Sequence, residues 1–396
     1  MTKLGFAMSR FMTLLFAVAC GMAVANIYFA QPLLDAIAGE FSIDRSAIGM
    51  IITVTQICYA LGLILLVPLG DLMNQRRLIA GQMLLSVLAL VTVGLAPTIA
   101  VLLAGMAGVG LLAVVTQTLV AFAASLAAPA DRGRVIGVVT SGIVIGILLA
   151  RTVAGILADA AGWRAVYLAS AGATLLLAVA LFRALPNIRC ERATISYFGL
   201  LRSVIYLFKQ ERILRIRGVL ALLIFTAFSI LWTSLVLPLS VPPFAFSYSE
   251  IGLFGLVGVA GALAAAKAGR LADRGLGQRT TGIALALLLL SWLPISLIEF
   301  SLWGLIVGII VLDFAVQAVH VTNQSMIMSV RPESRSRLTA GYMIFYSIGS
   351  AVGSIASTAV YAYAGWNGVC ILGASVSALA LLYWTLSRGR LFFLPI

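Results

Sequence analysis

Four polar side chains share one face of a long apolar segment. Asp313, Gln317, His320 and Gln324 follow one another at intervals of three or four residues within 302–328. At 100° per residue in a helix, they fall within about 60° of one another and form a polar stripe. A carboxyl group at membrane depth is costly, so an Asp two turns from the only His of the chain indicates a proton or substrate site. The alternative is a carboxylate that only hydrogen-bonds neighbouring helices.

Proton transfer would place specific demands on Asp313. Its carboxyl must be neutral when it faces hydrocarbon, and charged when it is wet or paired. His320, about 10 Å further along the helix, is a second candidate proton carrier, and Asp35 near the outer end of the first apolar span is a third. Arg151 also lies within a span. It must line a wet cavity, pair with Asp313 or Asp35, or extend its stem to the outer interface without a functional role.

The elements that must position these groups follow from the composition. The chain has 396 residues, of which 62% are hydrophobic and 10% charged, and a mean hydropathy of +1.12. A soluble domain would carry about a quarter charged residues. We therefore predict an all-α membrane protein with twelve transmembrane helices. They are expected near 11–34, 46–69, 79–96, 98–126, 136–158, 164–183, 217–240, 250–268, 280–298, 302–328, 338–361 and 367–387.

The net charge of +13 is explained by its placement. If both termini are cytoplasmic, all of the 26 Lys and Arg residues except Arg45, Arg151 and Arg164 fall on the inner side. This is the positive-inside rule, so we expect a multi-pass membrane protein with both termini in the cytoplasm. The excess charge contacts the anionic headgroups of the lipid bilayer, and no nucleic acid partner is needed.

An internal repeat divides the chain. Ser46, Ile48 and Gly49 recur as Ser249, Ile251 and Gly252, and Gly162-Trp163 recurs as Gly365-Trp366, each pair 203 residues apart. We therefore predict two pseudo-symmetric six-helix bundles, an N-terminal one at 1–183 and a C-terminal one at 217–396. Transporters built from such repeats bind substrate near the membrane midplane, between halves that rock against each other.

The segment between the halves, 184–216, is predicted to be a cytoplasmic linker. From Tyr197 to Arg217 it interleaves apolar and basic residues. This pattern favours an amphipathic helix along the inner leaflet, and a solvated tether is the alternative.

Two loops at equivalent positions of the halves carry a family resemblance. The stretch Gly269-Arg270-Leu271-Ala272-Asp273-Arg274-Gly275-Leu276-Gly277-Gln278-Arg279 resembles the G-x-L-a-D-R-x-G-R-R loop of the major facilitator superfamily. Pro68-Leu69-Gly70-Asp71-Leu72-Met73-Asn74-Gln75-Arg76-Arg77 is a weaker copy. The resemblance covers essentially the whole chain and implies the major facilitator fold.

These loops are expected to form a cytoplasmic gate. Acidic side chains at helix ends and basic side chains beyond them can make charge-assisted contacts with neighbouring helix termini, which would latch the outward-open state. The alternative is that the charges only anchor the loops and set topology. The gate residues are Asp71, Arg76, Arg77, Gly269, Asp273, Arg274 and Arg279.

One branch of the superfamily is favoured. The stretch Asn26-Ile27-Tyr28-Phe29-Ala30-Gln31-Pro32-Leu33-Leu34, with Gly162-Trp163-Arg164, is similar to bacterial twelve-span drug and sugar efflux proteins. Gly142 and Gly146 stand where that branch carries its antiporter signature, but Ile147 replaces the proline. The resemblance implies a drug:proton antiporter-like protein.

Polar and aromatic residues within the spans are candidates for a central cavity. In this superfamily the first helix of each three-helix unit lines the path. Each residue alone could equally make an interhelical hydrogen bond. The candidates are Asn26, Tyr28, Gln31, Gln56, Tyr59, Gln117, Arg151, Trp232, Thr233, Gln317 and Gln324.

These observations predict a secondary active transporter that moves a small organic solute by alternating access, with proton-coupled efflux as the expected direction. The alternatives are a facilitative uniporter, an importer, or a transporter-like sensor or channel. The sequence shows no nucleotide-binding motif and no nucleophile or metal constellation, so we expect no enzyme activity, metal or cofactor. The expected partners are a small-molecule substrate, protons and lipid, and the protein is expected to be a monomer.

Overall fold

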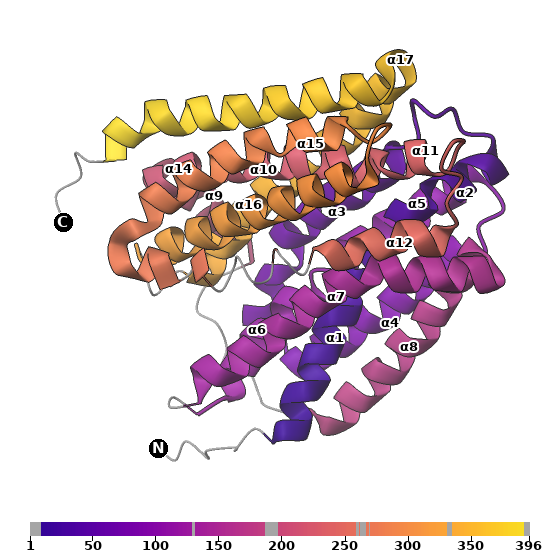
Figure 1. The fold of residues 1–396 in the computed structure, drawn as a ribbon. Helices are drawn as coiled ribbons and strands as arrows, with labels where there is room; N and C mark the ends of the chain where they lie inside the picture. Colours follow the sequence, from indigo (N-terminus) through magenta and orange to yellow (C-terminus); the bar gives the residue numbers. More distant parts are fainter. Residues whose placement is uncertain are drawn as a thin grey trace, which may run out of the picture.

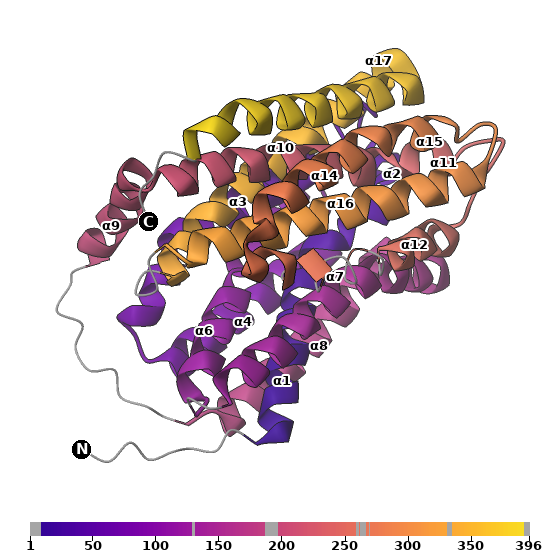
Figure 2. The ribbon, with the colours of Figure 1, turned by 60° about the vertical axis from the view of Figure 1, so that its left-hand side comes forward.

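The structure is a computed structural model and describes residues 9–128, 131–186, 197–258, 261, 267–268, 270–330 and 335–391. Its described residues form helices that run roughly alongside one another (Figure 1). The first described helix begins, and the last one ends, at the same end of the molecule (Figures 1 and 2). We call this the terminal end and the opposite one the distal end. The sequence predicts that the distal end faces outward.

The helices of the N-terminal half follow the predicted spans. They are α1 (Arg10–Tyr28), α2 (Ala30–Phe41), α3 (Met50–Leu65), η1 (Val67–Asp71), α4 (Gln75–Gly94), α5 (Ile99–Leu112), α6 (Val115–Leu126), α7 (Arg132–Ala161) and α8 (Trp163–Ala184). The first span is broken between α1 and α2. Pro32 has no N–H to donate to the preceding turn, so the helix is interrupted there. Tyr28 and Gln31 lie on either side of this interruption.

The linker and the C-terminal half continue this pattern. The elements are α9 (Tyr197–Gln210), α10 (Arg212–Ser234), α11 (Val236–Leu239), α12 (Tyr248–Val257), η2 (Ala272–Leu276), α14 (Gly277–Leu290), α15 (Trp292–Ser296), α16 (Leu302–Met328) and α17 (Arg335–Leu391). Helix α9 lies at the terminal end, where the Tyr197 hydroxyl donates to the Leu65 carbonyl at 2.8 Å. Contact of α9 with the lipid surface stays a prediction.

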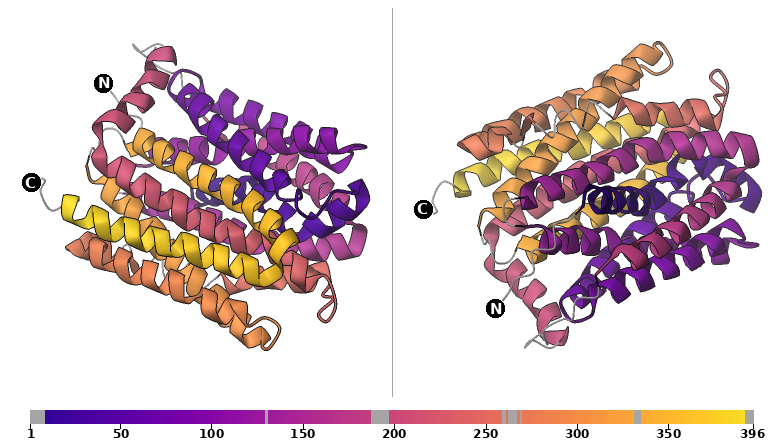
Figure 3. Two further views of the ribbon diagram at one scale, coloured as in Figure 1. Left: turned by 90° about the horizontal axis from the view of Figure 1, so that it is seen from above. Right: turned by 90° about the horizontal axis from the view of Figure 1, so that it is seen from below.

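The all-helical membrane architecture is confirmed. Ten helical segments of the described residues are long and apolar enough to cross a membrane. One of them, within α17, folds back on itself at Gly365, where φ is 59° and ψ is −159°, and thus crosses twice (Figure 3). The predicted eighth span is described as a helix only over Tyr248–Val257. The described residues thus show eleven crossings and part of a twelfth.

The two halves contact each other toward the distal end. Helix α3 packs on α17, and α7 packs on α12. Across the first interface, Thr53 Oγ1 donates to the Ala351 carbonyl at 2.9 Å, and Thr358 Oγ1 donates to the Ser46 carbonyl at 3.1 Å. Across the second, Thr152 Oγ1 donates to the Gly252 carbonyl at 3.0 Å. These bonds hold the halves together on the distal side.

The carboxylate of Asp159, in the last turn of α7, closes the second interface. It accepts from the backbone N–H groups of Tyr248, at 3.1 Å, and Ser249, at 2.7 Å. These two N–H groups belong to the first turn of α12, where a helix has no partners of its own for them. A residue of the N-terminal half therefore caps a helix of the C-terminal half.

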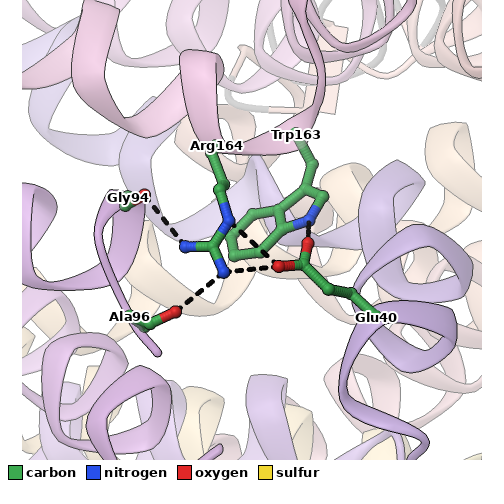
Figure 4. A network of polar contacts seen from close by, with 5 residues as sticks. All are labelled: Glu40, Gly94, Ala96, Trp163 and Arg164. Atoms are coloured by element: carbon green, nitrogen blue, oxygen red, sulfur yellow. Dashed lines mark hydrogen bonds and ion pairs between the residues drawn. The ribbon is translucent and has the colours of Figure 1, made fainter. Parts of the chain in front are cut away.

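A separate polar network fixes the distal corner of the N-terminal half (Figure 4). Glu40 accepts from the Trp163 indole at 2.6 Å and pairs with the Arg164 guanidinium. Arg164 also donates to the carbonyls of Gly94, at 3.1 Å, and Ala96, at 2.8 Å. The network thus joins the end of α2, the connection between α4 and α5, and the start of α8.

Candidate substrate and proton site

Arg151 of α7 points into the protein. Its side chain is 3% exposed. Nε donates to Gln31 Oε1 at 2.7 Å, and the guanidinium carbon lies 3.8 Å from the ring centre of Trp232. Contact between a guanidinium and an indole face is a favourable cation–π interaction. Of the three surroundings that the sequence allows for Arg151, an extension to the outer interface does not occur.

Asp313 of α16 is bound to the same tryptophan. The Trp232 indole Nε1 donates to Asp313 Oδ1 at 3.1 Å. Asp313 is 5% exposed. Gly258 packs so close to it that a Cβ added to this glycine would lie 2.9 Å from Asp313 Oδ2. Among the described residues, no carboxylate oxygen lies within 4 Å of the Arg151 nitrogens. The indole of Trp232 therefore contacts both charged groups, with its face against the Arg151 guanidinium and its N–H toward the Asp313 carboxylate.

Tyrosine hydroxyls extend this site between the halves. The hydroxyl groups of Tyr28, in α1, and Tyr346, in α17, are hydrogen-bonded. The Tyr28 ring centre lies 5.3 Å from the Arg151 guanidinium carbon. Tyr59 is buried nearby and hydrogen-bonds Gln117. Because residues of both halves meet here, this is a place where substrate could contact both. We call Tyr28, Gln31, Arg151, Trp232, Asp313 and Tyr346 the central cluster.

His320 belongs to a second polar group on α16. Its Nδ1 lies 3.0 Å from the Tyr342 hydroxyl, and the ring of Phe225 packs against it edge-on at 5.1 Å. Tyr342 also hydrogen-bonds Asn323. Phe225 contacts Tyr346 as well, with ring centres 4.0 Å apart. His320 thus reaches the central cluster only through aromatic rings, and Gln317 and Gln324 are half-buried along the same helix.

A buried cation that the sequence reasoning missed completes this second group. We expected Arg217 among the inner, topology-setting charges, but it is fully buried within the C-terminal half. Its Nη1 donates to Thr281 and to Asn323, each at 3.1 Å. Arg217 directly precedes an apolar span, and the residue types alone do not show whether such a side chain turns inward or toward the headgroups.

Three predicted site residues lie apart from the central cluster. Asn26 accepts from the Ser170 hydroxyl at 2.5 Å and lines a small cavity within the N-terminal half. Thr233 bonds to Ser354 at 3.0 Å between α10 and α17. Asp35 lies 3.9 Å from Arg45 and is partly exposed. The structure also buries Gln56, but its Oε1 has no hydrogen-bond partner.

The predicted cytoplasmic gate is only partly described. The Arg76 guanidinium carbon lies 4.3 Å from the ring centre of Phe182. Arg77, Arg274 and Arg279 are exposed. Gly269 and the side chains of Asp71 and Asp273 lie outside what the structure describes. The latch between these loops therefore stays a prediction.

The central cluster is closely packed. A cavity of about 10 Å³, room for roughly one water molecule, is lined by Arg151 and Trp232 together with Gln31, Pro32, Leu235, Val236 and Ile251. Its position between the halves means that relative motion of the halves would enlarge or close it. In this conformation the cavity has no room for an organic solute, and the cluster holds a guanidinium, a carboxyl group and two tyrosine hydroxyls.

Comparison with known proteins matches this geometry. Many secondary transporters are helical membrane proteins with two halves around a buried polar site. The sequence matches the Major Facilitator Superfamily over residues 13–274 and 217–391. The chain therefore belongs to the Major Facilitator Superfamily, and these relatives are transporters, not enzymes.

Individual relatives are similar over nearly their full length. The chain is 47% identical to the "Uncharacterized transporter YgaY" of Escherichia coli O157:H7 over 384 residues, which cover 97% of each chain. It is 32% identical to the "Probable transporter SCO4007" of Streptomyces coelicolor over 390 residues, 97% of this chain and 88% of the other. A crystal structure of a bacterial homologue of the human lysosomal transporter Spinster has a TM-score of 0.79 at 15% identity, covering 96% of both chains.

Proposed function

We propose that this transporter moves a small organic solute across the bacterial inner membrane by alternating access, coupled to protons that bind Asp313. The supporting observation is the position of Asp313, which is buried between the halves and linked through Trp232 to Arg151. A carboxyl group there changes the net charge of the site when it binds a proton. The two protonation states therefore favour different conformations and different occupancies.

The contacts between the halves support a conformation closed on the distal side. The interfaces of α3 with α17 and of α7 with α12 join the halves from the central cluster to the distal end. In the other conformation of the cycle these interfaces would separate. The loops with Asp71 and Asp273 would then meet, and their gate is part of this proposal.

The resemblance to efflux proteins favours export, in which proton entry drives solute exit. Uptake is a second candidate, because Arg151 lies beside the proton-binding carboxyl and would favour an anion that binds together with the proton.

We propose that both termini are cytoplasmic and that the protein acts as a monomer. Reporter fusions near residue 200 and at the C-terminus should then report the cytoplasm, and insertions near Asp159 the outside. A linker on the outside would contradict this topology.

Asp313→Asn tests the coupling. The purified protein in proteoliposomes should lose accumulation driven by a pH gradient of either sign but keep solute exchange, because a neutral side chain permits the conformational step without carrying a proton. His320→Gln should only shift the pH profile. Asp44→Asn, an exposed acid that hydrogen-bonds Ser46 in its own loop, is the matched control and should behave as the wild type. The sign of the gradient that drives accumulation distinguishes export from uptake. An Asp313→Asn protein that still concentrates solute would exclude this carboxyl from coupling.

A further inference from the structure

The Arg151 guanidinium has an unused donor group. Nε is bound to Gln31 Oε1, and the planar face is covered by Trp232. Nη2 is buried and has no hydrogen-bond partner. A buried cation normally has its charge balanced and its N–H groups satisfied, since the loss of hydration is otherwise uncompensated. The Nη2 N–H groups are therefore free to donate to a hydrogen-bond acceptor that the described part of the protein does not supply.

Among the described residues, no acid fills this position. Asp313 accepts the N–H at the edge of the Trp232 indole. Asp35 lies beside Arg45. The other groups close to Arg151 are the rings of Tyr28, at 5.3 Å, and Phe228, at 5.7 Å. The guanidinium is thus surrounded mainly by aromatic rings. Among the described residues, the carboxylate of Asp313 contacts one of these rings, the indole of Trp232.

The walls of the cavity beside Arg151 indicate the chemical character of the part of a ligand that does not bind the guanidinium. Apart from Gln31 and Arg151, it is lined by Pro32, Trp232, Leu235, Val236 and Ile251. Helix α12 presents Gly252 and Gly255 toward Arg151, so the backbone approaches closely without side chains of its own. Such walls would contact an apolar or aromatic body once the halves move apart and the cavity widens. A cationic group would be repelled by the guanidinium.

We infer that the substrate is a small organic monoanion with an apolar body, whose carboxylate or similar anionic group binds Arg151 Nη2. This inference rests on the proposed function, because it concerns the same site. It deepens that proposal by naming the class of substrate. An N–H of a guanidinium donates a strong, charge-assisted hydrogen bond to a carboxylate oxygen.

The charges of the central cluster connect this anion to the proton. With Asp313 ionised and no substrate, Arg151 and Asp313 sum to zero. With Asp313 protonated and an anion bound, the sum is zero again. An anion without the proton, or the proton without the anion, leaves a net charge buried between the halves, which is costly. The neutral states are therefore the ones that can close. The anion and the proton then travel in the same direction, as in the uptake candidate and unlike export driven by proton entry.

Thermal unfolding of the purified full-length protein tests the inference without any gradient. The probes are three molecules of similar size and different charge, benzoate, benzamide and benzylammonium, together with the matching cyclohexyl series. A ligand that binds only the folded state raises the unfolding midpoint. Benzoate and cyclohexanecarboxylate should raise it by about 2 °C or more in mildly acidic buffer, and less in neutral buffer. The amides and ammonium compounds should have little effect.

Three variants locate the effect. Arg151→Gln should lose the response to carboxylates. Asp313→Asn should keep it and make it independent of pH, because it mimics the protonated form. Arg217→Gln removes the other buried guanidinium and should keep the response, even if its own midpoint is lower.

Several results would overturn the inference. In the first, neither series shows a preference for carboxylates over amides. In the second, the ammonium compounds give the larger response, and Asp313→Asn abolishes that response. In the third, the response to carboxylates is lost in Arg217→Gln but not in Arg151→Gln. Failure of proton coupling is a separate result. It would appear as wild-type accumulation by Asp313→Asn in proteoliposomes, with carboxylate binding intact.

Discussion

Gly49 of α3 packs against the backbone carbonyl of Ser354 in the other half of the molecule. Its repeat counterpart, Gly252 of α12, packs in the same way against the carbonyl of Arg151. Ser354 and Arg151 are also 203 residues apart. The distal closure is therefore built twice, by equivalent contacts between a glycine and a backbone carbonyl, and the internal repeat extends to the contacts between the halves.

The first prediction concerns these glycines. In Gly49→Ala and Gly252→Ala, the new Cβ would collide with a carbonyl oxygen, and such overpacking costs about 1–3 kcal/mol. Because the collision exists only when the distal end is closed, each variant should shift the protein toward the distal-open state. Spin labels at Leu95 and Phe300, which are 64% and 83% exposed, should report a longer distance. Gly81→Ala, whose Cβ would meet nothing within 4 Å, is the control. Unchanged distances in both variants would show that these glycine contacts do not control closure of the distal end.

The second prediction concerns Asp159. Asp159→Ala removes the carboxylate that accepts from Tyr248 and Ser249 at the start of α12. Loss of a helix cap of this kind costs about 1 kcal/mol, which corresponds to about a fivefold change in the balance between the closed and open states. The same labels should therefore show more of the long distance. Asp44→Ala, which loses bonds only to Ser46 in its own loop, should leave the distances unchanged. An equal effect of the two variants would indicate a general charge effect.

The third prediction is a double-mutant cycle at Tyr28 and Tyr346, whose hydroxyl groups bond across the halves. Each change to Phe leaves the other hydroxyl buried without its partner, so each should slow transport. The double variant should lose less than the sum of the two single effects. Initial transport rates in proteoliposomes give the comparison. Tyr167→Phe is the control, because the Tyr167 hydroxyl is buried without a partner, and its removal should be neutral or stabilising. Additive losses would mean that the two hydroxyls act independently.

The fourth prediction concerns the Glu40–Arg164 pair shown in Figure 4. Both side chains are partly exposed, so the charge pair itself contributes about 0.2–1 kcal/mol and is weakened by salt. Glu40→Gln should lower the unfolding midpoint slightly and reduce its dependence on salt. Arg164→Gln should lower it further, because the carbonyls of Gly94 and Ala96 also lose a donor. Calorimetry at low and high salt measures both, and equal midpoints for the two variants would argue against a role of the carbonyl contacts.

The parts of the fold that depend on composition could be predicted from the sequence. The lengths of the apolar segments indicate the spans, because hydrocarbon thickness leaves few alternatives. The recurring Gly-Trp and Ser-x-Ile-Gly patterns predict the two halves, and the bounds of these halves stay a prediction. For Arg151 the sequence predicts a wet cavity, a pair with Asp313 or Asp35, or an extension to the outer interface. Among the described residues Arg151 forms no direct pair with either acid, and Arg151 and Asp313 both contact Trp232 instead. Their roles in transport stay predictions.

Other features depend on how helices are rotated and paired. Asn26 and Thr233 are polar residues within spans, like Tyr28 and Trp232, but they bond within their own halves. Residue type does not show whether a helix face turns to its own bundle or to the other half. The contact of Trp232 with both charged groups, the burial of Arg217 and the cap that Asp159 places on α12 likewise required the assembled structure.

Arg151 takes part in the distal closure with its backbone and in the central cluster with its side chain. Its carbonyl oxygen is the atom against which Gly252 packs, while its guanidinium contacts Trp232. Any movement that withdraws this turn of α7 from α12 therefore also carries the guanidinium away from the indole. Opening of the distal end and release of a ligand bound to Arg151 would then occur in one step, because the same residue takes part in both.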